Sequence, residues 1–438
     1  MPLIALAVLA YAAGLAAGFL GASVAAILLG AGFSAFAAVK RQRVHAALGA
    51  LVVAGACIAL YDAAHEARCR AEAPARAQWS ARLEDAAAPG AYVRADVRWP
   101  GCAMPASMSV ERGRAAAGDR VSIAGTVFVT ARGLKITHAR ITAGGARDAL
   151  LVARAAIGAR IDTLFRGDAP LVRALLIADE RAVDPTVRDR FAVAGIVHML
   201  SISGLHVAII AMAVELLCRM ARLRPATASI ATLAITAAYV TVIGLPAPAV
   251  RSGVMLGVRS LCKLLQRPTS PWAALALGAA APLASPATVL DLGYQLSVLG
   301  MAALVASGAL ARRVIPGAWT GVRASLSRTL LTSCVACCAS APLVAWTFGR
   351  ISLVAPITNI LATPVVAVLQ PALFLAVAIS PVRSLGMLLA DACHPLLRAL
   401  DGIATVGASV PYAALTVAPT LATAILAGGA SVALLVAC

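Results

Sequence analysis

The sequence is 438 residues long, and 61% of its residues are hydrophobic while only 13% are charged. Its mean hydropathy is +0.89. A soluble domain is roughly half apolar and about a quarter charged, so this composition excludes a soluble globular protein and predicts a polytopic α-helical integral membrane protein. The net charge of +18 comes almost entirely from arginine, and part of it is topogenic because cytoplasmic loops collect Lys and Arg.

Residues 1–61 are predicted to be N-terminal transmembrane helices. The apolar run from Met1 to Val39 lacks the basic start of a signal peptide, and it is long enough to cross the bilayer twice at about 20 residues per span. A third span follows at 46–61. Basic clusters separate these and later spans: Lys40, Arg41 and Arg43; Arg219, Arg222 and Arg224; Lys263 and Arg267; Arg312 and Arg313; Arg323 and Arg328. Placing all of them inside predicts a cytoplasmic N-terminus and an extracytoplasmic segment at 62–190.

Within that segment, residues 62–155 are predicted to form an extracytoplasmic OB-like small β-barrel domain. Alternating apolar residues, many of them β-branched, indicate about five strands, at 92–99, 107–112, 120–129, 134–141 and 150–155. OB-like barrels often hold single strands; a β insertion without a ligand is the alternative. Base stacking would rest on Trp79, Tyr92, Trp99 and Phe128. Residues 156–190 are predicted to be an amphipathic helical connector.

Two of the ten cysteines, Cys69 and Cys102, fall in the extracytoplasmic segment. An oxidising compartment allows them to form a disulfide, which is worth about 3 kcal/mol on chain-entropy grounds. The others include the run Cys334, Cys337 and Cys338 in an apolar helix. No histidine or carboxylate accompanies this run, so small residues in helix packing explain it better than a metal site.

Residues 191–438 are predicted to form a transmembrane helical bundle of about seven to nine membrane segments. The candidates lie near 196–217, 228–245, 249–265, 271–284, 287–308, 329–347, 354–380, 384–408 and 413–436. Several are short or interrupted by proline and glycine. Such breaks are tolerated at membrane depth where the backbone lines a cavity or is buried in protein, so some candidates are expected to be re-entrant.

Polar residues gather at one of these segments, in the stretch from Gly195 to Val207, which contains His198, Ser201, Ser203, Gly204 and His206. Unpaired polar groups in hydrocarbon cost several kcal/mol each. On one helix the two histidines would lie within about 80° of each other and could share a pore-facing side. The usual zinc spacing and the nucleophile elbow of hydrolases are both missing, so no catalytic residue and no metal is expected. Histidines satisfied by packing are the alternative to a path lining.

Four more polar residues lie in or beside the apolar segments: Arg251, Asp291, Gln295 and Asn359. A guanidinium near a helix N-terminus opposes the helix dipole but suits phosphate or carboxylate; an arginine that snorkels to the interface is the alternative. Asp291 either caps its helix, pairs with Arg251 or contacts a ligand. Asn359 lies in a break beside Pro356.

The stretch His198–Val207, with Ser-Ile-Ser-Gly-Leu-His-Val at its end, resembles the signature of the ComEC family, inner-membrane proteins of bacterial DNA uptake. Three further stretches agree in order, at Gly244–Arg251, Asp291–Ser297 and 342–359. The opening spans and the OB-like loop with a disulfide also resemble that family. Many members carry a metallo-β-lactamase-like domain after the channel; no such metal motif is present here, so this is expected to be a short or truncated member without nuclease activity.

The resemblance implies an inner-membrane channel that passes single-stranded DNA into the cytoplasm during competence. The candidate path residues are the histidine stretch together with Arg251, Asp291, Gln295 and Asn359. No phosphate-binding loop is present, so no cofactor is expected, and a separate DNA receptor, nuclease and ATPase or helicase would act as partners, besides the lipid bilayer. The path could be formed by a homo-oligomer. A small-molecule or ion transporter built on broken transmembrane helices is the alternative function.

Overall fold

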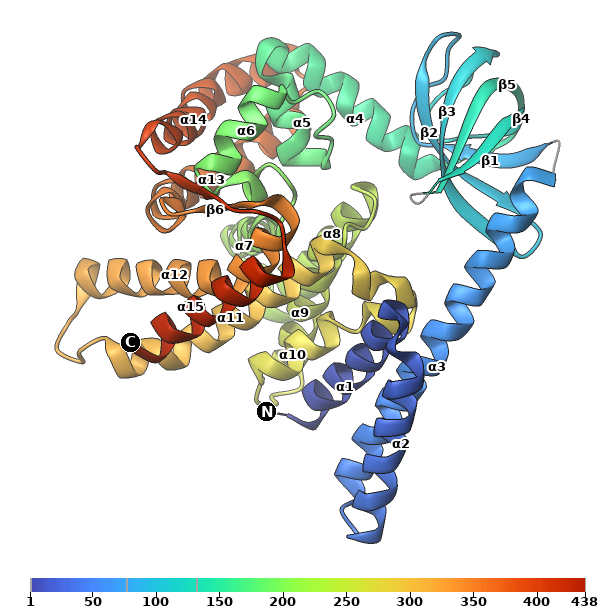
Figure 1. The fold of residues 1–438 in the computed structure, drawn as a ribbon. Helices are drawn as coiled ribbons and strands as arrows, with labels where there is room; N and C mark the ends of the chain where they lie inside the picture. The colour runs from blue at the N-terminus through green and yellow to red at the C-terminus, as the bar shows by residue number, and fades with distance from the viewer. Residues whose placement is uncertain (1, 76–77, 131–132, 438) are drawn as a thin grey trace. The chain divides into compact units, whose positions relative to one another are not determined.

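The computed structural model describes residues 2–75, 78–130 and 133–437 (Figure 1). The chain divides into two compact units. One comprises residues 10–159 and holds apolar helices and a β-barrel, and the other comprises 1–9 and 160–438 and is a helical bundle.

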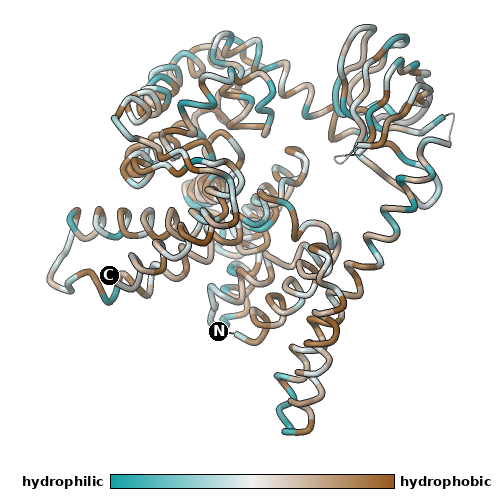
Figure 2. The backbone as a smooth tube through the Cα atoms, in the orientation of Figure 1, coloured by the Kyte–Doolittle hydropathy of each residue, from teal (hydrophilic) through white to brown (hydrophobic). Residues whose placement is uncertain are grey.

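The first helices are α1 (Leu3–Ala17), α2 (Ser23–Val39) and α3 (Arg43–Glu72). A five-residue π-helical break at Gly18–Ala22 separates α1 from α2 within the apolar stretch Leu3–Val39. Glycines let these helices approach closely. A Cβ at Gly55 would lie 2.3 Å from the carbonyl oxygen of Tyr11, and one at Gly49 would lie 2.8 Å from that of Gly30. Figure 2 shows hydrophobic residues along most of these helices.

Five strands follow α3: β1 (Trp79–Leu83), β2 (Tyr92–Trp99), β3 (Cys102–Arg112), β4 (Asp119–Thr130) and β5 (Gly133–Arg147). They close into a barrel in the order β1-β2-β3-β5-β4, in which β3 and β5 run parallel and the other pairs are antiparallel. Alternate side chains point inward, and Val97, Met108 and Ile123 at its centre are fully buried.

Four of the five predicted strands coincide with β2, β3, β4 and β5. The strand predicted at 150–155 is wrong, because these residues belong to α4 (Ala149–Phe165). Asp148 decides the matter: its Oδ1 accepts hydrogen bonds from the amides of Leu150 and Leu151, which caps a helix. The strand that sequence analysis missed is β1, whose five residues include no β-branched side chain.

The barrel is joined to the helices on either side of it in the chain. A disulfide links Cys69 near the end of α3 to Cys102 at the start of β3, as predicted. On β1, Arg82 donates to Asp96 at 2.6 Å and to Asp148 at 2.9 Å. Burial opposes ionisation of Asp148, but the hydrogen bonds from Leu151, Arg82 and Leu150 outweigh it and lower the pKa of this carboxyl.

The second unit is built from helices. After α4 come α5 (Ala169–Ile177), α6 (Pro185–Val193), α7 (Gly204–Met220), α8 (Pro225–Val242), α9 (Ala247–Leu264), α10 (Pro271–Gly278), α11 (Leu292–Val314), α12 (Gly321–Phe348), α13 (Ala355–Ile379), α14 (Arg383–Ser409) and α15 (Leu421–Ala437). Strands β6 (Arg350–Ser352) and β7 (Ala414–Thr416) pair into a small ribbon. The predicted connector is helical, as α4 to α6 show.

Six helical segments in the described part of the chain are long and apolar enough to cross a membrane, two of them in the first 72 residues. The others are α8, α11, α12 and α13, and the apolar stretches of α10 and α15 are shorter. The chain is therefore a multi-pass membrane protein. Several predicted segments differ in detail: the one at 196–217 becomes α-helical only at Gly204, and the one at 413–436 divides into β7 and α15.

Ion pairs hold the connector helices to the rest of the bundle. Arg190 on α6 donates to Asp401 on α14 at 3.0 Å, and Arg350 on β6 donates to Asp189 at 2.7 Å. Around α5, Arg173 binds both Asp162 and Asp179. Two of these ion pairs therefore hold α6 to the rest of the bundle, and the pairs of Arg173 connect parts of the connector to each other.

Candidate functional site

The site begins where α7 starts. Ser203 is the N-cap residue, and it forms a capping box in which His206 occupies the position that usually holds Glu or Gln. The backbone N–H of Ser203 donates to Nδ1 of His206 at 3.1 Å. Because an amide can only donate, Nδ1 is the acceptor and the ring proton of the neutral imidazole is on Nε2. The side chain of His206 is fully buried, and its Nε2 has no hydrogen-bond partner among the described residues.

His198 lies outside that helix. It belongs to a single 3-10 turn, Val197–Met199, and the hydroxyl of Ser201 donates to its carbonyl at 3.1 Å. The prediction that both histidines share one helix face is therefore wrong, because the cap at Ser203 starts a new helix. The side chain of His198 is exposed.

Arg251 lies in the second turn of α9 and is buried, with 4% of its surface exposed. Its Nε and Nη1 have no partner within the described ranges. It is therefore buried in the protein, whereas a snorkelling arginine would reach the interface. Two glycines make room for it. A Cβ at Gly278 on α10 would lie 2.7 Å from Cγ of Arg251, and one at Gly204 on α7 would lie 3.4 Å from its Nη2.

Both unpaired side chains offer donors. Nε2 of neutral His206 carries a proton, and an arginine has only donors and stays charged at any ordinary pH. A buried donor left unpaired costs about 1–3 kcal/mol, and more for a charged group. A group with several acceptor oxygens, above all an anionic one, would satisfy them. Helices α7 and α9 pack directly against each other, so one ligand chemistry suits both residues.

Three of the predicted site residues already form hydrogen bonds with neighbouring groups of the protein. Asp291 caps α11, since its Oδ1 accepts from the amide of Tyr294 at 2.6 Å; of its three predicted roles, capping is confirmed. The side-chain amide of Gln295 donates to the carbonyl of Val289 at 2.9 Å. Asn359 on α13 donates to the hydroxyl of Ser333 on α12 at 3.2 Å, and its Oδ1 is buried without a partner in the part of the chain that the structure describes.

Sequence analysis missed several residues of this region. Tyr294 is buried, donates to the carbonyl of Ala279 at 2.6 Å and lies within electrostatic reach of Arg251. Gln370 on α13 is 1% exposed, and neither atom of its amide has a partner among the residues described. A lone amide directly before Pro371 in an apolar helix was a readable signal for Gln370. Gly278 offered no such signal, because small residues are common throughout the chain.

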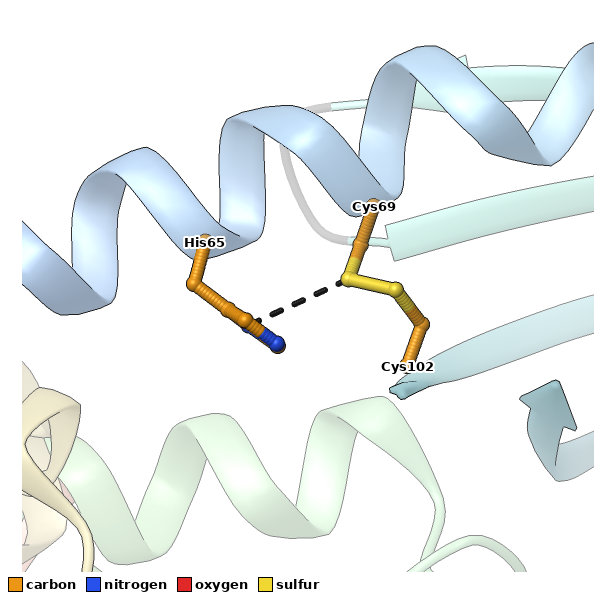
Figure 3. Close-up of side chains that lie close together, drawn as sticks. All are labelled: His65, Cys69 and Cys102. Atoms are coloured by element: carbon orange, nitrogen blue, oxygen red, sulfur yellow. Dashed lines mark hydrogen bonds between the residues drawn. A yellow bond between two sulfur atoms is a disulfide. The ribbon is translucent and has the colours of Figure 1, made fainter. Parts of the chain in front are cut away.

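One group of metal-type ligands exists among the described residues, formed by His65, Cys69 and Cys102 (Figure 3). The two sulfurs are joined in a disulfide. A metal needs the thiolates as ligands, so the oxidised pair offers it no thiolate.

The chain thus combines a multi-pass helical bundle, which holds buried donors without partners among the described residues, with a closed β-barrel, and these features define its class as a polytopic membrane protein with a β-domain. The family model described as "Competence protein" matches residues 175–438, which is more than half of the chain. The protein therefore belongs to the competence protein family, the ComEC family that its motifs resemble.

The ComE operon protein 3 of Bacillus subtilis (strain 168) is 26% identical to this chain over 195 residues. The match covers 44% of this chain and 24% of the relative, so it spans only about a quarter of that protein. No solved structure matches.

Proposed function

We propose that this protein forms a path for single-stranded DNA across the bacterial inner membrane during competence. The observation that carries the proposal is the set of buried, unpaired donors on His206 and Arg251. Each nucleotide brings an anionic phosphate with acceptor oxygens, and phosphate contacts supply most of the affinity for nucleic acid. A phosphate passing this point satisfies donors that the protein leaves open, which lowers the free energy of a charge inside an apolar bundle.

The barrel is proposed to receive the strand as an extracytoplasmic OB-like domain. Its strand order and the parallel pairing of β3 with β5 support that assignment. Of the four aromatic residues expected to stack on bases, Trp79 and Trp99 are buried in the barrel core, whereas Tyr92 is 64% exposed and Phe128 is 53% exposed. The stacking surface therefore reduces to these two. Exposed basic residues accompany them: Arg94, Arg98, Arg112, Arg120, Lys135 and Arg140.

The proposed topology follows from the basic residues at the start of α3. Lys40, Arg41 and Arg43 mark the turn before it and favour the cytoplasm, so α3 delivers the barrel to the opposite side. A separate receptor, nuclease and motor, or a homo-oligomeric path, would complete the system. Asp291, Gln295 and Asn359 remain proposed path residues by their ordered motifs, although each already contacts its own surroundings.

The test compares two arginines on the same helix. In a competent bacterium that depends on this protein, we expect Arg251→Ala to abolish internalisation of labelled DNA into a nuclease-protected form. Arg259→Ala changes an exposed residue of α9 and should leave uptake near the wild-type level. Membrane abundance and detergent gel filtration of both variants control for expression and folding.

Uptake at the wild-type level in a well-folded Arg251→Ala protein would refute the proposed path. The transporter alternative makes a different prediction, because the wild-type protein in liposomes would then move small anions and Arg251→Ala would stop that flux while DNA internalisation persisted.

A further inference from the structure

The polar end of α3 brings a histidine against the disulfide. His65 and Cys69 are four residues apart, one turn of the helix, so their side chains share a face. Nδ1 of His65 lies 3.9 Å from Sγ of Cys69, and Sγ of Cys69 is bonded to Cys102 (Figure 3). Cys69 is 3% exposed and Cys102 is 6% exposed.

The hydrogen bonds of His65 fix where its proton is. Nε2 lies 3.0 Å from the carbonyl oxygen of Gly101, and because a carbonyl only accepts, Nε2 carries the proton. Nδ1 of the neutral ring then has a free lone pair, and this lone pair is on the atom nearest to the sulfur. Gly101 directly precedes Cys102, so the same histidine also holds the backbone that presents the second cysteine.

The two contacts of His65 differ in their dependence on the barrel. Its pairing with Cys69 needs only a turn of α3, whereas Cys102 is 33 positions away in sequence from Cys69 and approaches only when β3 is in place. Cys69 therefore has a proton acceptor beside it before its partner arrives. Among the described residues, His65 is the one histidine grouped with the two cysteines, and it lies on the helix of Cys69, not on the strand of Cys102.

We propose that His65 is the proton acceptor that makes Cys69 the nucleophile in forming the Cys69–Cys102 disulfide. Nδ1 takes the proton of the Cys69 thiol, and the thiolate attacks a disulfide of an external oxidant such as glutathione disulfide. A mixed disulfide forms at Cys69 and one thiolate of the oxidant leaves. The thiolate of Cys102 then attacks Sγ of Cys69, the protein disulfide forms, and a second thiolate leaves. Two protein thiols are oxidised and one disulfide is reduced, and the protons of the Cys69 and Cys102 thiols pass to the two departing thiolates.

The experiment measures closure of the disulfide in the full chain in detergent. The protein is reduced with a phosphine, freed of reductant, and mixed with excess glutathione disulfide; acid-quenched samples are analysed by peptide mass spectrometry. At pH 7 we expect His65→Ala to close roughly fivefold more slowly than wild type, because a thiol without a nearby base is mostly protonated there. The ratio should approach one above about pH 9, where thiols ionise unaided. Any opening that admits the oxidant is common to both proteins and cancels in the ratio.

Three controls distinguish proton transfer from support of the fold. His45→Ala removes an exposed histidine of the same helix and should close at the wild-type rate. His65→Gln keeps a donor for Gly101 but has no basic nitrogen, so it should close as slowly as His65→Ala. In traps that keep only one cysteine of the pair, the glutathione adduct, located by peptide mass spectrometry, should form faster on Cys69 in Cys102→Ser than on Cys102 in Cys69→Ser. A slowing that is independent of pH, rescue by glutamine, or a faster adduct on Cys102 would each overturn the proposal.

Discussion

The barrel and the helical bundle treat one arginine each in different ways. In the barrel, Arg82 binds two carboxylates, and a disulfide fastens the start of β3 to α3. In the bundle, Arg251 and His206 are as deeply buried as the apolar core, yet Nε and Nη1 of Arg251 and Nε2 of His206 have no partner among the described residues. A buried charge without a counter-charge costs free energy, so Arg251 carries a cost that the two carboxylates reduce for Arg82. A region that keeps such a cost is where a ligand is expected.

The largest effect on stability is expected when the disulfide between Cys69 and Cys102 is removed. Replacing Cys102 with Ala is expected to lower the free energy of unfolding of the barrel by about 3 kcal/mol, because the unfolded chain regains loop freedom. Trp79 and Trp99 in the barrel core report this unfolding by fluorescence in a urea titration. Cys262→Ala, which changes a half-buried free cysteine of α9, is the matched control. Equal midpoints for both variants would show that the disulfide does not stabilise the barrel.

A somewhat smaller effect is expected where the bundle makes room for Arg251. In Gly278→Ala the new Cβ would lie 2.7 Å from Cγ and 3.0 Å from the carbonyl oxygen of Arg251, so α9 and α10 must separate at a cost of roughly 1–3 kcal/mol. Gly300→Ala on α11 meets nothing within 4 Å and should be neutral or slightly stabilising. Thermal unfolding in detergent measures both. A Gly278→Ala protein as stable as Gly300→Ala would contradict the tight fit around the arginine.

The comparison is sharpest when the two arginines are replaced by the same apolar residue. Arg251→Met removes a buried cation with unpaired donors, so we expect the bundle to gain about 1 kcal/mol of stability, or to lose none, while DNA uptake is lost. Arg82→Met leaves two carboxylates without their partner, so we expect the barrel to lose about 1 kcal/mol, a modest value because this pair is partly exposed. If Arg251→Met destabilises the bundle as much as Arg82→Met destabilises the barrel, then Arg251 has hydrogen-bond partners in the protein without DNA.

Much of the barrel was predictable because strand alternation is local information. The strands at 92–99 and 120–129 were found from their pattern alone. Two errors arose where the pattern is weak. Trp79–Leu83 has no β-branched residue, and Leu150–Ala155 is a short apolar run that suits a strand or a helix until the cap at Asp148 is seen.

The candidate site was predictable only as a set of polar residues. Whether each polar group has a hydrogen-bond partner depends on its neighbours in space. Asp291 and Gln295 form hydrogen bonds near the start of their own helix, whereas Arg251 has donors without partners among the described residues. The sequence alone could not show this difference. The prediction of one continuous helix through His198 and His206 was wrong, because a new helix starts at the cap Ser203. In the capping box of this helix a histidine takes the place of the usual acidic partner, so the sequence pattern did not reveal the helix start.

The smallest expected effect is a dependence of barrel stability on acid pH that the bundle site does not share. The folded-state pKa of Asp148 lies below its usual value, so this carboxylate stabilises the fold fully above the unfolded-state pKa of about 3.9, and the contribution disappears as the pH falls through the lower folded-state value. Relative to Asp148→Asn, the wild-type barrel should therefore be more stable by about 1 kcal/mol or less at pH 6, and the difference should shrink as the pH falls below the unfolded-state pKa. Urea titrations followed through the barrel tryptophans measure it, with Asp119→Asn, another carboxylate of the barrel region, as the control. Because an amide retains the acceptor oxygen of the helix cap but not the charge that holds Arg82, a difference that stays constant across this range would show that the charge of Asp148 does not stabilise the barrel.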